Sequence, residues 1–268
     1  MTSPTTLAGV LCLFLAALTA GCATPGPGSV DPGKDRITAS DESDASRRAR
    51  VRMELAALYF GDGQMTTALD QVKLAIVADP NFPEAYNLRG LIYANLGDDR
   101  LAEESFRRAL QLSAQDGDVM QNLGYFLCQK KRYPEADVLF DRALTVPRYA
   151  SAPRTWFTKG VCQAFAGQLA QAEASLTRSY ELDPANPSTA VTLSEVLYRR
   201  GEYERARFYV RRVNALPGVA NAQSLWLAVR IEHRIGNQAG VQDLGGQLRR
   251  RFPDAPETRA FSEGRFDE

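Results

Sequence analysis

The side chains that could perform catalysis or hold a metal ion are few and poorly spaced for either task. The chain has four cysteines and one histidine, His233, and no two cysteines form a Cys-x-x-Cys pair. Structural and catalytic zinc sites need several such ligands, so a metal centre of this kind is not expected. No Ser/His/Asp set, phosphate-binding loop or paired-carboxylate motif stands out, and we expect His233 to be structural or solvated. The sequence therefore predicts a non-enzyme with no cofactor, no metal and no small-molecule substrate.

The composition is that of an ordinary globular protein without a charge bias. Of the 268 residues, 44% are hydrophobic and 24% are charged, and Lys plus Arg (32) equals Asp plus Glu (32). A nucleic-acid partner would call for a basic excess, which is absent. We therefore expect no nucleic acid among the partners.

Residues 83–116 carry small and bulky side chains in a distinctive phase. Gly90 and Ala102 would let two antiparallel helices approach closely, Tyr93 and Phe106 would fill the space beside that contact, and Gly97 would end the first helix. This spacing resembles the tetratricopeptide repeat (TPR), a helix-turn-helix unit of about 34 residues. One such unit cannot bury its apolar face, so further copies are expected on both sides.

Stepping along the chain by 34 residues finds those copies, with a two-residue slip between the third and fourth. An irregular helical domain would not explain the shared phase. In the third unit Lys131 stands where the turn glycine is expected. The resemblance implies an all-α fold, a right-handed superhelix of about six repeats over 47–254 with a short C-terminal cap over 255–268. The predicted units are 49–82, 83–116, 117–150, 153–186, 187–220 and 221–254.

The N-terminus has the pattern of an export signal. Residues 7–20 are apolar and uncharged, a length that suits a signal peptide and is short for a membrane span. Leu18-Thr19-Ala20-Gly21-Cys22 resembles the lipobox of bacterial lipoproteins, which implies removal of residues 1–21 and acylation (palmitate) of Cys22. Ala23 follows, so the resemblance implies sorting to the outer membrane. An ordinary secretory signal with an incidental Cys22 is the alternative, and the true start codon could lie upstream.

Residues 23–46 are rich in Pro, Gly, Ser and Asp and cannot bury enough apolar surface to fold alone. Together with Cys22 they are predicted to form a flexible tether (22–46) between the lipid and the array.

In TPR proteins the first helix of each unit faces a concave groove, and positions 2, 5, 9, 12 and 13 point into it. In this chain those positions mix aromatic, aliphatic and polar residues, which suits an apolar or amphipathic peptide. Large aromatics are favoured anchors in such contacts. The alternative is that some of these side chains pack within the array. The predicted groove residues are Met53, Phe60, Asn87, Leu91, Asn95, Tyr125, Phe157, Phe165 and Tyr198.

Two cysteines remain after export, because Cys12 leaves with the signal peptide and Cys22 is lipidated. An oxidising periplasm permits a bond between Cys128 and Cys162. However, they occupy positions 12 and 10 of their units, so one should face the groove and the other pack inward. We expect two free, mostly buried thiols.

The lipobox, the tether and the six units together resemble the type IV pilus biogenesis and stability lipoproteins. The run from Gln121 to Cys128 carries the most specific match, through Asn122, Gly124, Phe126, Leu127 and Cys128. The ending from Phe252 to Glu257, with Gly264 and Phe266, resembles that family's closing helix.

The resemblance implies a pilotin, a lipid-anchored outer-membrane protein facing the periplasm. Such a protein binds secretin subunits and promotes their localisation and multimerisation. Contacts are then expected near the first repeats, at Met53, Phe60, Leu91 and Tyr125. The rival hypothesis is a periplasmic TPR adaptor lipoprotein for peptidoglycan hydrolases or outer-membrane assembly factors.

Overall fold

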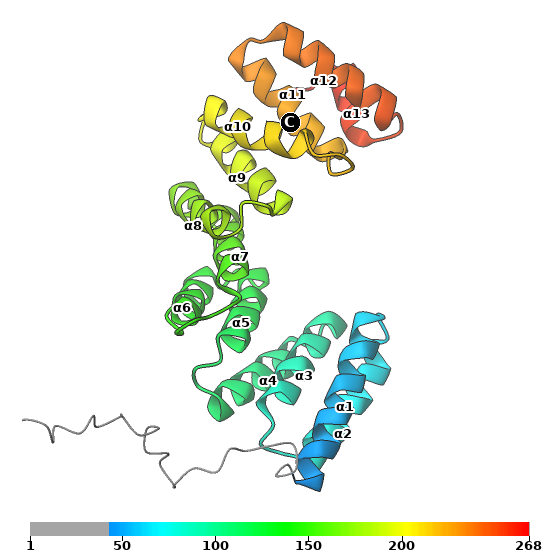
Figure 1. Ribbon diagram of the computed structural model, residues 1–268, viewed down its shortest axis with the longest axis vertical. Coiled ribbons are helices and arrows are strands. Elements are labelled where there is room, and N and C mark those ends of the chain that lie inside the picture. Colours follow the sequence, from blue (N-terminus) through cyan, green and yellow to red (C-terminus); the bar gives the residue numbers. More distant parts are fainter. Residues whose placement is uncertain (1–42, 268) are drawn as a thin grey trace, which may run out of the picture. The chain divides into compact units, whose positions relative to one another are not determined.

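The computed structural model describes residues 43–267, and this part of the chain contains helices and no strands. Twelve of its helices form six antiparallel pairs, and a thirteenth closes the array (Figure 1). The pairs are α1 (Asp44–Gly61) with α2 (Met65–Ala78), α3 (Pro83–Leu96) with α4 (Asp99–Leu112), α5 (Gly117–Gln129) with α6 (Tyr133–Leu144), α7 (Ala152–Phe165) with α8 (Leu169–Leu182), α9 (Pro187–Arg199) with α10 (Tyr203–Asn214), and α11 (Ala222–Ile235) with α12 (Gln238–Arg251). The last helix is α13 (Pro256–Ser262).

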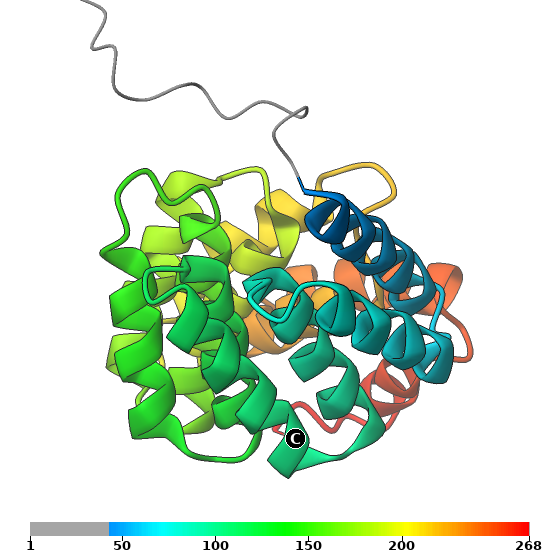
Figure 2. The ribbon, with the colours of Figure 1, turned by 90° about the horizontal axis from the view of Figure 1, so that it is seen from below.

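Each pair packs on the next one along the chain, and the second helix of one pair contacts the first helix of the following pair. Seen along the array, the successive pairs are rotated about its axis (Figure 2). The prediction of an all-α repeat solenoid is therefore confirmed.

Within each of three helix pairs, a glycine of the first helix packs against a bulky side chain of the second, as the repeat phase predicted. A Cβ atom added at Gly90 would lie 2.7 Å from the Phe106 ring, and one at Gly124 would lie 2.8 Å from the Phe140 ring. At Gly160 the added atom would lie 2.6 Å from Leu176. Since real Cβ atoms do not approach other atoms so closely, these glycines let the two helices of three consecutive pairs touch.

Left-handed residues end the first helices. Gly97 adopts φ 81° and Gly167 adopts φ 78°. Lys131 takes the same conformation, with φ 60°, in the turn between α5 and α6. The substitution noted in the sequence is thus accommodated without changing the turn, although a side chain in this region costs about 1–2 kcal/mol.

A disulfide joins Cys128 on α5 to Cys162 on α7, with their Cα atoms 5.8 Å apart. The expectation of two free thiols was therefore wrong. Both cysteines are buried, at 6% and 3% exposure, because both face the contact between the two first helices. Their repeat positions had suggested that one side chain faces the groove and the other packs inward, but in the structure the two side chains meet between α5 and α7.

The first helix starts earlier than the predicted tether allows. The tether was assigned through residue 46, but α1 begins at Asp44, so its last three residues are helical. An acidic residue in the first turn stabilises a helix N-terminus, and Arg47 forms an ion pair with Asp44 at 3.6 Å. The signal peptide (1–21), Cys22 and the tether as far as residue 42 lie outside the described residues.

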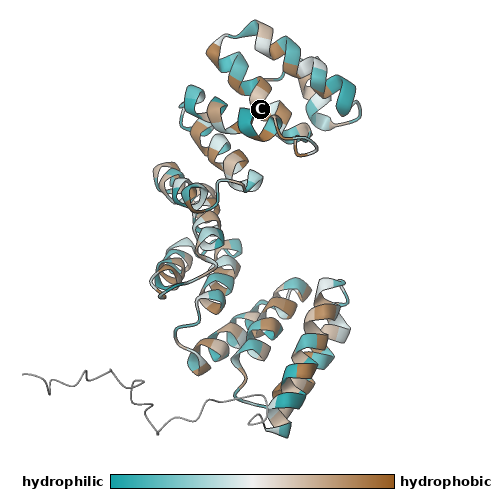
Figure 3. Ribbon diagram, viewed as in Figure 1, coloured by the Kyte–Doolittle hydropathy of each residue, from teal (hydrophilic) through white to brown (hydrophobic). Residues whose placement is uncertain are grey.

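The end of the array is covered by α13. Phe261 of α13 packs directly on Gly245 of α12, and Phe266 stacks on His233 of α11 with ring centroids 4.3 Å apart. His233 is therefore a half-buried packing residue. Hydrophilic and hydrophobic residues alternate along the helices (Figure 3), and no helix within residues 43–267 is both long and apolar enough to span a membrane.

Candidate protein-binding groove

The first helices α5, α7 and α9 lie side by side and enclose a cavity of about 430 Å³, here called the first-helix cavity. Helix α5 contributes one residue, α7 contributes five and α9 contributes four. The lining residues are Tyr125, Phe157, Thr158, Val161, Ala164, Phe165, Thr192, Glu195, Val196 and Arg199. Seven of the ten occupy positions that the sequence assigned to the groove. Three of these, Tyr125, Phe157 and Phe165, were among the predicted binding residues, and the structure brings all three to one cavity.

Two of these aromatic side chains are unusually exposed. Phe165 is 72% exposed and Tyr125 is 46% exposed, whereas Phe157 is half-buried against the core formed with α9 and α11. Water-exposed aromatic rings that converge on a concave surface are typical of protein-binding anchors. The cavity can therefore take apolar side chains of a partner.

Charged groups on α9 line the same cavity. Glu195 and Arg199 are one helical turn apart, a spacing that usually forms an ion pair. Here Arg199 donates a hydrogen bond to the Ala164 carbonyl at 3.5 Å instead. Both charges therefore remain available to polar groups of a bound segment.

The walls of the first-helix cavity are held by buried polar contacts and the disulfide. Lys159, 7% exposed, forms ion pairs with Asp137 and Asp141 of α6. Gln163 donates to Asp137 at 3.0 Å and accepts from Ser175 of α8 at 2.7 Å. These contacts fix α7 between α6 and α8, and the disulfide fixes it to α5, so the aromatic rings are presented on a rigid wall.

A second set of contacts fixes the start of α7. The Tyr149 hydroxyl donates to Asp118 of α5 at 3.1 Å and accepts from Thr155 at 3.1 Å. Burial raises the pKa of Tyr149 to about 12, and the negative charge of Asp118 acts in the same direction. The phenol therefore stays protonated and keeps the long α6–α7 connection in place at all physiological pH values.

The remaining predicted residues do not line the first-helix cavity. Met53 and Phe60 are half-buried against the core of the first two repeats. Leu91 packs against the core formed mainly by α4, α5 and α6. Asn87 accepts a hydrogen bond from Asn122 at 3.2 Å, and Asn95 donates to the Leu91 carbonyl of its own helix. None of these five residues is among those that line the cavity with Tyr125.

Tyr198 packs inside the array. It is 7% exposed, its ring lies 5.5 Å from Tyr203, and Arg230 stacks over it at 4.5 Å. The prediction that it lines an open groove is not supported, because α11 and its arginine cover this position. Repeat position alone could not reveal the covering side chain.

Other lining residues were missed when the groove was predicted from selected positions. Thr158, Thr192 and Val196 fall outside the five groove positions used for each unit, and they line the cavity where α7 and α9 contact each other. No signal in a single repeat would identify them. Within residues 43–267, no cluster of three His, Cys, Asp or Glu side chains is placed to hold a metal ion.

Comparison with known proteins agrees with this architecture. Tetratricopeptide repeat models match residues 83–116, 118–146 and 166–225. Proteins with this fold are typically scaffolds for protein–protein interaction rather than catalysts.

The similarity extends over nearly the whole chain in one curated relative. The type IV pilus assembly protein PilF of Pseudomonas aeruginosa PAO1 is 28% identical over 259 residues, which cover 96% of this chain and 98% of PilF.

Two solved structures are similar in both sequence and fold. PilW, described as a widely conserved type IV pilus biogenesis factor, is 29% identical with a TM-score of 0.73, over 79% of this chain and 97% of PilW. The structure of Pseudomonas aeruginosa PilF is 26% identical with a TM-score of 0.73, over 83% of this chain and 100% of that one. The chain thus contains tetratricopeptide repeats and is homologous to PilF and PilW, two tetratricopeptide repeat proteins of type IV pilus biogenesis.

Proposed function

We propose that this protein is an outer-membrane lipoprotein that binds secretin subunits of the type IV pilus and promotes their assembly in that membrane. The observation that carries the proposal is the first-helix cavity, where Tyr125, Phe157 and Phe165 converge on a rigid wall in a homologue of PilF and PilW. An unassembled subunit exposes apolar segments that such a cavity can hold.

Lipidation of Cys22 would add to this function through proximity. The resemblance of Leu18 to Cys22 to a lipobox supports an acyl anchor on Cys22, which precedes α1 in the chain. A protein attached to the same membrane as its partner binds it at a high effective concentration, so modest affinity per contact is sufficient.

The groove is tested by complementing a deletion strain with Phe165→Asp. We expect loss of heat-stable secretin multimers and of twitching, because a carboxylate at the cavity repels apolar side chains and must be desolvated on binding. Phe208→Asp is the matched control, since Phe208 is a similarly exposed aromatic (54%) on the second helix α10. Normal multimers with Phe165→Asp, or in the deletion strain itself, would refute the proposal. The second result would favour the alternative adaptor function.

The anchor is tested separately with Cys22→Ala. We expect the unacylated protein to leave the outer-membrane fraction and the yield of multimers to fall, with folding unchanged because Cys22 precedes the array. Mass spectrometry of the mature wild-type N-terminus gives the direct readout. An unmodified N-terminus released into the periplasm would rule out the lipoprotein.

A further inference from the structure

A second apolar cavity lies between the second helices α4 and α6, with α5 as its floor. It has a volume of about 650 Å³ and is here called the second-helix pocket. Leu123 and Leu127 of α5 are buried at its base, and Val138 of α6 stands 59% exposed at its edge. The lining residues are Arg107, Leu110, Gln111, Leu123, Leu127, Pro134, Glu135, Val138, Leu139 and Arg142. None of them lines the first-helix cavity.

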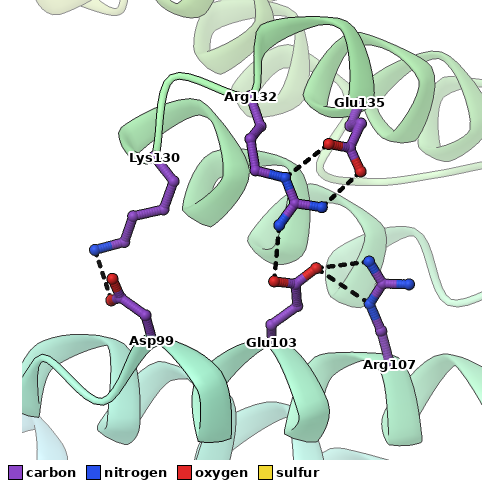
Figure 4. Close-up of polar contacts among 6 residues, drawn as sticks. All are labelled: Asp99, Glu103, Arg107, Lys130, Arg132 and Glu135. Carbon is purple, nitrogen blue, oxygen red and sulfur yellow. Dashed lines mark hydrogen bonds and ion pairs between the residues drawn. The ribbon is translucent and has the colours of Figure 1, made fainter.

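A network of ion pairs frames one side of this pocket (Figure 4). Arg132 binds Glu135 through two nitrogens at 2.6 Å each and reaches Glu103 of α4 at 2.8 Å. Glu103 also accepts two bonds from Arg107, at 3.2 and 2.6 Å. Beside them Lys130 pairs with Asp99 at 2.6 Å. The network ties α4 to the α5–α6 turn and fixes the width of the pocket.

The negative charges of α4 and α6 are all paired, some within this network and some outside it. Helices α4 and α6 contain six carboxylates, and each is paired with a cation inside the fold. Three of the six, Asp99, Glu103 and Glu135, are paired as Figure 4 shows. Of the other three, Glu104 pairs with Arg100, and Asp137 and Asp141 pair with Lys159.

In contrast to these carboxylates, guanidinium groups at the pocket retain hydrogen-bond donors that are not used within the fold. Arg142 lines it and is exposed, and no ion pair of its side chain is seen in the described part of the chain. Arg107 uses its Nε and one Nη nitrogen for Glu103, so its other Nη remains available. The pocket therefore combines an apolar floor with guanidinium donors at its rim.

We propose that the second-helix pocket docks an acidic amphipathic helix of a protein partner, with bulky apolar side chains on one face and a carboxylate beside them. The apolar residues enter between α4 and α6, and the carboxylate pairs with Arg142. A volume of this size accommodates several side chains, as helix-in-groove recognition requires. An anionic membrane is a poorer fit, because a flat surface cannot fill a hollow whose leucines lie at the base.

The test uses the complete protein immobilised in detergent and a display library of 16-residue helical peptides, selected in competition with a Val138→Asp variant. We expect selected peptides with Leu, Ile or Phe at helical spacing and Asp or Glu within one turn of them. In the leading synthetic peptide, acid-to-amide substitution should weaken binding about tenfold, as for a close charge pair at an interface.

Variants of the protein locate the site. Val138→Asp and Arg142→Glu should each weaken binding about tenfold or more, and Arg142→Lys should retain most of it. Phe165→Ala, in the first-helix cavity, should leave it unchanged. Val138 and Arg142 are exposed, and unchanged thermal melting will confirm that these variants fold.

Three results would overturn the proposal: no enriched peptide, binding indifferent to Val138→Asp and Arg142→Glu, or enrichment without carboxylates. The membrane alternative is tested with vesicles containing 30% phosphatidylglycerol, a composition chosen for the assay. Vesicle binding that is lost in Arg142→Glu, without peptide binding, would also overturn it. Because no secretin is used, these results are independent of the proposed pilus function.

Discussion

At the scale of single residues, Glu103 is the carboxylate on which two repeats converge. Burial acts to raise its pKa, but hydrogen bonds and charges from Arg132 and Arg107 outweigh burial, and the pKa of Glu103 lies below its usual value. A carboxylate with a lowered folded-state pKa stabilises the fold above its unfolded pKa of about 4.3, and the contribution disappears as pH falls through the folded value.

Glu103→Gln should therefore lower the free energy of unfolding by about 1 kcal/mol at pH 7, with solvent screening limiting the effect. The deficit relative to wild type should shrink below about pH 4, where the wild-type carboxylate is itself protonated. Urea midpoints at pH 7 and pH 3.5 measure it. Glu104→Gln is the control, because its pair with Arg100 is exposed and should contribute little. A deficit that does not change with pH would contradict the ionic explanation.

Two adjacent glycines in α12 should respond to alanine in opposite directions. A Cβ at Gly245 would lie 1.9 Å from the Phe261 ring, whereas one at Gly246 would meet only the Arg250 side chain at 3.2 Å. Gly245→Ala should destabilise the protein by about 1–3 kcal/mol through overpacking. Gly246→Ala should stabilise it by up to about 1 kcal/mol through helix propensity. Melting temperature and the protease resistance of α13 are compared for the two variants. Equal effects of the two substitutions would show that α13 does not pack on Gly245.

At the scale of helices, the disulfide is a covalent cross-link between two neighbouring repeats. It joins α5 to α7 and closes a loop with a sequence separation of 34 residues. The loop-closure model gives such a bond about 3–4 kcal/mol of stability, through its effect on the unfolded chain.

The double variant Cys128→Ser/Cys162→Ser should melt at a lower temperature than wild type and should be insensitive to dithiothreitol. When the wild-type protein is reduced, its melting temperature should fall toward that of the variant. Because the bond also fixes the wall that presents Tyr125 and Phe165, secretin binding should weaken in the same variant. Identical melting of wild type with and without reductant would mean that the two cysteines are not bonded.

The phase of Gly90, Ala102 and Phe106 made the helix pairs predictable, because close helix contact leaves few choices of side chain there. The same phase placed Tyr125, Phe157 and Phe165 on one face. How neighbouring first helices pack on each other could not be predicted from the phase within one repeat. That packing brings Cys128 to Cys162 and places Thr158, Thr192 and Val196 in the lining of the cavity.

The burial of Tyr198 could not be predicted from the sequence, for a different reason. Its repeat position points toward the groove, but Arg230, 32 residues further along, covers its ring. The second-helix pocket was not anticipated at all, because its walls come from two units and its charge balance depends on pairs such as Arg132 with Glu103. The period of about 34 residues brings equivalent helices together but does not specify which of their side chains will pair.

At the scale of the whole protein, one helix serves both cavities. Helix α5 places Tyr125 in the first-helix cavity and Leu123 and Leu127 in the second-helix pocket. A repeat array exposes two kinds of helix surface, so one stack of pairs can hold two partners at once. Two binding surfaces on one array are compatible with the secretin-assembly function proposed above.

Site-specific photo-crosslinking in living cells tests the proposed function most directly. A photoreactive phenylalanine analogue replaces Phe165 on α7 or, as the matched control, Phe208 on α10, and the products are probed for the secretin. We expect a crosslink to the secretin from position 165 and none from position 208. Equal crosslinking from both positions, or none from position 165 while the strain still assembles pili, would contradict secretin binding in the first-helix cavity.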